Sequence, residues 1–132
     1  MIKLSAIQLN SKANVEHNLS VIAAQLARLT SEVSADTIEH LVVLPECCLF
    51  FGANDKAQLQ LATQSQANNQ LQRSLSQLAK QYQVTLIAGT IPILAESEEK
   101  FTNSSCAFSP KGELIGRYDH ACINFISIVK IS

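Results

Sequence analysis

The sequence predicts an α/β layered fold, because segments with the pattern of buried strands alternate with segments that have the pattern of amphipathic helices. Three short apolar runs predict strands, and two longer segments repeat apolar residues at spacings of three and four. A hairpin pattern follows them. With 132 residues the chain forms at most one domain, which is long enough to bury a core without disulfides or a metal.

The first part of the chain has two predicted strands on either side of one predicted helix. Residues 2–9 alternate apolar and polar side chains over their first half, which favours a strand. Residues 15–34 repeat apolar residues with helical spacing behind a candidate N-cap, Asn14. Residues 38–44 show no polar alternation, so we expect a strand buried on both faces. Pro45 lacks an amide proton and ends this strand.

A long helical segment and a third strand come next. Residues 54–82 are rich in glutamine and in good helix formers, and their apolar positions share one helical face. These positions are Leu71, Leu75, Leu78, Ala79 and Tyr82. Residues 84–88 predict a third buried strand, which we expect Gly89 to end.

The last predicted element is a β-hairpin. Its strands are residues 101–108 and 113–118, and they flank the turn sequence Ser-Pro-Lys-Gly at 109–112. Proline and glycine stand at positions where turns prefer them. The chain shows neither an internal repeat nor a flexible linker.

Composition excludes several classes of partner. The chain has 10 basic and 11 acidic side chains and no run of Lys or Arg, so we expect neither nucleic acid nor a membrane surface as partner. No segment has the pattern of a signal peptide or a membrane helix, so we expect a cytoplasmic protein. The four cysteines have neither CxxC spacing nor clustered histidines, which predicts free thiols, no metal site and no cofactor.

Glu46 is the candidate catalytic residue that position alone indicates. It follows Pro45 at the carboxyl end of a predicted buried strand, where open α/β sheets place their sites. Its neighbours Leu44, Leu49 and Phe50 are apolar, and a desolvated carboxylate suits general-base chemistry. A solvated surface glutamate, or one that caps a helix, is the alternative interpretation.

Four pieces of sequence, in order, carry a resemblance to a known family. They are LVVLPE at 41–46, LIAGT at 86–90, TNSS at 102–105 and GELIGRYD at 112–119. From Met1 to Asp119 the chain resembles the amino-terminal half of the nitrilase, or carbon-nitrogen hydrolase, superfamily, and it is most similar to the omega-amidase and deaminated-glutathione-amidase branch. The resemblance implies the amino-terminal part of an α-β-β-α sandwich, which would be incomplete here.

The resemblance also implies a chemistry. In this family a cysteine thiolate attacks a small amide or a nitrile, a glutamate transfers protons, and a lysine stabilises the oxyanion. The resemblance assigns the general base to Glu46. His120 stands at the position of the lysine, where an imidazole is a poor replacement for an ammonium; a residue without a role is the alternative.

The family's nucleophile lies beyond a further strand, which this sequence does not reach. Cys122 comes too early in the order of elements to be that residue. Cys47 and Cys48 adjoin Glu46, but neighbours on an extended segment point to opposite sides, so the usual interpretation is a buried inert thiol. We therefore expect a truncated amidase for small carboxylate-bearing amides that is inactive as this chain.

Residues 120–132 form a divergent apolar tail. The family pattern stops abruptly after Asp119, which suggests a reading-frame change. Because a half-sandwich leaves sheet surface uncovered, we expect a homo-oligomer, or aggregation through the exposed sheet, although the tail could also add one strand to it. The alternative function is a non-catalytic assembly module that associates with a full-length relative.

Overall fold

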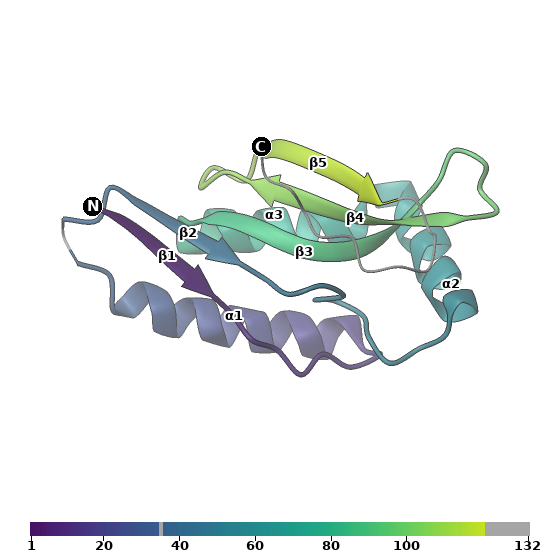
Figure 1. Cartoon of the computed structure of the whole chain (residues 1–132), viewed down its shortest axis with the longest axis horizontal. Helices are drawn as coiled ribbons and strands as arrows, with labels where there is room; N and C mark the ends of the chain where they lie inside the picture. The colour runs from purple at the N-terminus through teal and green to yellow at the C-terminus, as the bar shows by residue number, and fades with distance from the viewer. Residues whose placement is uncertain (35, 121–132) are drawn as a thin grey trace.

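The computed structural model describes residues 1–34 and 36–120, and its centre is a five-stranded mixed sheet in the order β1-β2-β3-β4-β5 (Figure 1). The strands are β1 (Ile2–Ala6), β2 (Glu39–Val43), β3 (Thr85–Leu94), β4 (Phe101–Phe108) and β5 (Leu114–His120). Strands β1, β2 and β3 run parallel, whereas β4 and β5 add to them antiparallel. The predicted α/β fold is confirmed.

Helix α1 (Val15–Ser31) forms for the reason that the sequence indicates. The Asn14 side chain accepts a hydrogen bond from the His17 amide at 2.9 Å, which caps the first turn. Ile22 and Leu26 face inward and are fully buried. The helix therefore connects β1 to β2 as a crossover that packs on the sheet.

The predicted helix over residues 54–82 is instead two helices with a break between them. Helix α2 (Asp55–Ser65) continues into a short 3-10 turn, η1 (Gln66–Asn68), and α3 (Gln70–Tyr82) follows. Asn69 lies between them with a φ of 47°, the left-handed conformation that asparagine tolerates better than most residues. The apolar face of α3 is nevertheless as expected, and its buried members are Leu71, Leu75, Leu78 and Ala79.

Strand β3 does not end at Gly89, as we expected from the sequence. It continues to Leu94, because β4 pairs with it along this second half, with Ile91 opposite Ser104 and Leu94 opposite Phe101. The pairing shifts between Ala88 and Ile91. Gly89 therefore belongs to an irregularity within the sheet, as glycine inside strands often does.

The two faces of the sheet differ in what covers them. Side chains on one face, such as Val42, Leu86 and Cys106, pack with α1 and α3 in a single core cluster. The opposite face, which we call the open face, carries the alternate residues Ile2, Leu4, Leu41, Val43, Ile87, Ser105, Ala107, Gly116 and Tyr118. The expected burial of residues 38–44 on both faces is thus half correct: His40 and Val42 are buried, whereas Leu41 and Val43 are half-buried.

The hairpin of β4 and β5 is confirmed. The Ser109 amide donates to the Glu113 carbonyl at 2.8 Å, and Gly112 adopts a φ of 81° that favours glycine. The predicted boundary at residue 119 stays a prediction, since the tail residues 121–132, Cys122 among them, lie outside the described residues. Within the part of the chain that the structure describes, none of the helices has both the length and the apolar character needed to cross a membrane.

Candidate functional site

Glu46 lies on a tight turn directly beyond the carboxyl end of β2. The Leu44 amide still donates to the Ile87 carbonyl of β3 at 2.8 Å, and the chain then reverses at Cys47, whose φ of 52° is left-handed. Such a conformation is uncommon for a cysteine and is concentrated at functional sites. Glu46 itself is exposed, so the expected desolvated setting is wrong for this structure. Its role as general base stays a prediction.

Strand β3 supports this turn from one side. A Cβ placed on Gly89 would lie 1.9 Å from the Pro45 carbonyl oxygen, so only glycine lets the two backbones approach this closely. The next residue, Thr90, accepts a hydrogen bond from the Cys47 amide through its Oγ1 at 2.9 Å. The irregular part of β3 at Gly89 and Thr90 therefore packs against the Glu46 turn and forms a hydrogen bond with it.

Helix α1 supports the same region from the other side, through the buried side chain of Asn18. Its Nδ2 donates to the Lys12 carbonyl at 2.7 Å and to the Leu49 carbonyl at 2.8 Å, and its Oδ1 accepts from the Lys12 amide at 2.9 Å. The Phe51 amide also donates to the Lys12 carbonyl, at 3.1 Å. One asparagine therefore joins the segment after β1 to the segment after Glu46.

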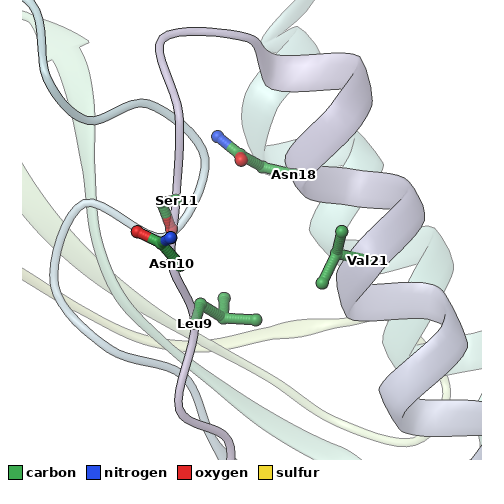
Figure 2. A pocket seen from close by; sticks show the side chains of 5 residues that line it. All are labelled: Leu9, Asn10, Ser11, Asn18 and Val21. Atoms are coloured by element: carbon green, nitrogen blue, oxygen red, sulfur yellow. The ribbon is translucent and has the colours of Figure 1, made fainter.

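Figure 2 shows Asn18 extending from α1 toward the segment that carries Asn10 and Ser11. These residues surround a cavity of about 10 Å³ together with Leu9 and Val21. This volume holds at most one water molecule. Asn18 thus belongs to a packed joint rather than to a substrate pocket.

The cysteines beside Glu46 have the properties of structural thiols. Burial raises the pKa of the Cys48 thiol to about 12, and burial also raises the pKa values of Cys47 and Cys106. A raised pKa lowers the thiolate fraction on which nucleophilic attack depends. The extended geometry that we expected for this segment is wrong, because Cys47 sits in a left-handed turn.

The end of β5 carries the other candidate, His120. The residue is half-buried and pairs with Asn103 of β4, and its ring packs edge-on against Tyr118 with the ring centroids 4.7 Å apart. Adjacent strands lie about 4.8 Å apart, so β2 and β5 are separated by about 14 Å. Among the described residues no ion pair joins Glu46 to His120, and a role for His120 stays a prediction.

Asp119 points to the helix-covered side of the same strand. Its Oδ1 accepts hydrogen bonds from Arg117 Nε and from the buried Ser104 hydroxyl, both at 2.7 Å. The Arg117 bond lowers the pKa of Asp119, and the Ser104 bond acts in the same direction. Both Arg117 and Asp119 line a groove of about 910 Å³ beside the start of α3.

A further hollow of about 360 Å³ lies near the amino ends of β2 and β3, beside the buried His40. His40 Nε2 lies 2.8 Å from Ser5 Oγ, and burial, with a smaller contribution from Lys3, lowers the pKa of His40. Glu46 lines neither this hollow nor the groove at Asp119. Among residues 1–34 and 36–120, no cluster of three or more His, Cys, Asp or Glu side chains is placed to hold a metal ion.

Sequence reasoning missed Asn18, Gly89 and Thr90 as parts of the site. Asn18 did give a signal, because it is a polar residue at a core-facing position between Val15 and Ile22 of an amphipathic helix. Gly89 was identified, but as a strand end. Thr90 was noted only as the last residue of LIAGT, one of the four pieces of the resemblance, and its contact with Cys47 was not expected because the two residues lie 43 positions apart in the sequence.

Comparison with known proteins gives a consistent result. The family model described as carbon-nitrogen hydrolase matches residues 3–124. The chain is 33% identical to an omega-amidase of Saccharomyces cerevisiae and 31% identical to a deaminated glutathione amidase of Synechocystis sp., over 89% and 86% of its length. The crystal structure of Saccharomyces cerevisiae Nit3, a member of the nitrilase superfamily, superposes with a TM-score of 0.67 at 28% identity, covering 89% of this chain and 43% of that one. The chain spans about 40% of the length of the two amidases, 40% of the first and 39% of the second.

Proposed function

Because this chain belongs to the carbon-nitrogen hydrolase family, we propose that it is the base-bearing, amino-terminal part of an amidase for small carboxylate-bearing amides. Glu46 is the general base in this proposal. The observation that carries it is the turn after β2, which is held by Thr90 on one side and by the Asn18 joint on the other. A base that must face one reacting carbon needs such a rigid support.

The proposed reaction divides its roles between this chain and groups outside it. Glu46 accepts the proton of an attacking thiol and returns it to the departing amine, while a lysine stabilises the oxyanion. Here His120 stands at the lysine position, and the described thiols have raised pKa values. We therefore propose that the chain alone does not hydrolyse amides, since grouped catalytic residues act as a unit.

A chimaera tests the role of Glu46. Residues 1–119 replace the matching part of the yeast omega-amidase, which keeps its own downstream residues, and ammonia release from omega-amides is measured. We expect activity in the chimaera and a loss of about 10³-fold or more in Glu46→Gln. The matched control is Glu16→Gln, at an exposed glutamate in the first turn of α1.

Two outcomes decide the proposal. Equal activity of a folded chimaera and its Glu46→Gln variant removes the assignment of the base. Ammonia release by the purified 132-residue chain, abolished in Glu46→Gln, instead contradicts the proposed inactivity. We also propose a cytoplasmic location, for which the free thiols of Cys47, Cys48 and Cys106 give support.

A further inference from the structure

His40 is a buried histidine at the amino end of β2, on the helix-covered side of the sheet. It is 5% exposed, and the strand register places it beside Lys3 of the edge strand β1. Its Nε2 lies 2.8 Å from the hydroxyl oxygen of Ser5, which is also in β1. Among the described residues, its Nδ1 is the only buried side-chain nitrogen or oxygen atom that has no hydrogen-bond partner. Such atoms are rare in folded proteins and call for an explanation.

This arrangement suits the neutral ring and opposes the protonated one. In the neutral ring that carries its proton on Nε2, the N–H donates to Ser5 and Nδ1 holds only a lone pair. In the imidazolium form both nitrogens are donors, so Nδ1–H would be a buried donor without an acceptor. A buried charge and an unsatisfied donor both cost free energy. The closed arrangement therefore favours the neutral form of His40.

The charged groups nearest to His40 do not compensate a proton on its ring. Lys3 lies on the same side of the sheet, where its Nζ donates to the Leu29 carbonyl at 3.3 Å, and its charge repels a second cation. The Glu39 carboxylate is directed to the open face, where it accepts from the Thr85 hydroxyl at 3.1 Å. Burial, and then the charge of Lys3, lower the pKa of His40, in agreement with this geometry.

The elements packed over the ring bring no acidic group to it. A hollow of about 360 Å³ adjoins the ring, and α1 and α3 line it with Thr30 and Tyr82. Glu39 is the only acidic residue in this lining. Glu32 and Asp36, in the segment between α1 and β2, are exposed, and the Asp36 carbonyl accepts from the N-terminal ammonium at 3.2 Å. The surroundings of the ring therefore hold no counter-ion for an imidazolium.

We propose that His40 is an acid-sensitive latch that holds the amino end of β1 against β2. Neutral His40 keeps the pair closed through Ser5, whereas the protonated ring is hydrated only when this end opens and water from the hollow reaches Nδ1. Within the described residues β1 pairs with β2 alone, so its end opens without breaking another strand pair.

The sign of the pH dependence follows from the two states of the latch. The opened end leaves the ring in water and binds a proton more tightly than the closed end does. The pairing therefore loses stability as the pH falls below about 6.5, the pKa of an unperturbed histidine. This device is independent of the role of Glu46.

NMR spectroscopy of the full 132-residue chain tests the latch. The imidazole signals of His40 report its protonation, and we expect their midpoint below about pH 6.5. Hydrogen exchange reports the opening at the Ile38 amide, which donates to the Met1 carbonyl at 2.8 Å. Its protection factor should fall about fivefold or more between about pH 7 and about pH 5. The Leu44 amide, which donates to β3 at the other end of β2, should keep its protection factor within about twofold.

Three variants assign the effect to the ring. His40→Gln removes the proton site and keeps an amide that can reach Ser5, so the fall at Ile38 should be less than about twofold. The matched control is His17→Gln, at an exposed histidine of α1, which should leave the fall unchanged. Lys3→Gln removes the facing charge, so it should raise the His40 midpoint and make the fall smaller.

Three results overturn the proposal. A His40 midpoint at or above about pH 6.5 means that the closed arrangement does not oppose protonation. An equal fall at Ile38 and Leu44 means that acid unfolds the chain as a whole. A fall at Ile38 that persists in folded His40→Gln assigns the acid sensitivity to another group. If His40→Gln does not fold, the His40 midpoint and its change in Lys3→Gln decide the matter.

Discussion

The turn that carries Glu46 and the end of β5 that carries His120 are built in different ways. The Glu46 turn is exposed at its tip, but its base is fixed by buried groups of α1 and β3. The end of β5 lies on an edge strand, where residues 114–119 are exposed and only the strand's last residue, His120, is half-buried. The comparison teaches that this chain holds one half of the proposed amidase site rigidly and leaves the other half at the margin of the sheet.

The largest expected loss of stability comes from a substitution at Gly89, where the backbone of β3 lies against the backbone of Pro45 beneath the Glu46 turn. In Gly89→Ala the new Cβ would meet the Pro45 carbonyl oxygen at 1.9 Å, so one of the two backbones must move. Overpacking that forces the backbone to shift lowers the free energy of unfolding by about 3 kcal/mol. Urea denaturation followed by circular dichroism measures this loss.

A glycine of β5 provides the matched control for that substitution. In Gly116→Ala the nearest contact of the new Cβ is the Ala107 Cβ at 3.9 Å, an ordinary van der Waals distance. We expect its unfolding free energy to stay within about 0.5 kcal/mol of the unsubstituted chain. Equal losses in the two variants would mean that the Glu46 turn is no more tightly packed than the edge strand.

The second-largest expected loss of stability follows from removing the hydrogen bonds by which Asn18 joins the segment after β1 to the segment after Glu46. Asn18→Ala removes three hydrogen bonds and leaves the Lys12 amide and the Leu49 carbonyl without this partner. Stranded buried polar groups cost about 2 to 3 kcal/mol in total. We expect that loss in urea denaturation, together with faster hydrogen exchange of the Phe51 amide, which donates to the Lys12 carbonyl.

Asn14→Ala is the control for Asn18→Ala, because it removes an exposed cap from the same helix. It should cost about 1 kcal/mol and leave the exchange of the Phe51 amide unchanged. If both variants accelerate that exchange equally, Asn18 acts through the helix as a whole and not through the joint.

The sequence predicted the elements whose signals are local. Spacings of three and four predicted α1 and the apolar face of α3, and Pro45 marked the end of β2 and so the place of Glu46. The break at Asn69 was missed although Asn68 and Asn69 are weak helix formers, because the left-handed conformation of one asparagine leaves no periodic trace in the sequence.

The parts that the sequence did not predict depend on partners outside each local segment. Strand β3 passes Gly89 because β4 pairs with its second half, and the pattern of residues 84–89 alone does not show this hairpin pairing. The support of the Glu46 turn likewise joins Asn18 to Leu49 and Cys47 to Thr90. A single sequence shows which residues can form hydrogen bonds, but not which of them pair. Local patterns therefore predicted the position of Glu46, but not the residues that hold its turn in place.

The smallest effect concerns Asp119, on the β5 side of the comparison. Asp119→Asn removes the charged partner of Arg117, and both side chains are partly exposed, at 47% and 38% respectively. Exposed ion pairs contribute about 0 to 1 kcal/mol, so the loss at neutral pH should not exceed about 1 kcal/mol.

The contribution of Asp119 to stability should also depend on pH. Because the Arg117 bond lowers the pKa of Asp119 in the folded chain, this contribution is present above the unfolded pKa of about 3.9 and is lost as the pH falls through the lower pKa of the folded chain. The stability difference between the chain and Asp119→Asn in urea denaturation should therefore shrink between pH 7 and pH 3. Glu113→Gln removes a charge from the same hairpin without an ion pair in the described residues, and a difference that shrinks equally there would contradict the assignment to the Arg117 pair.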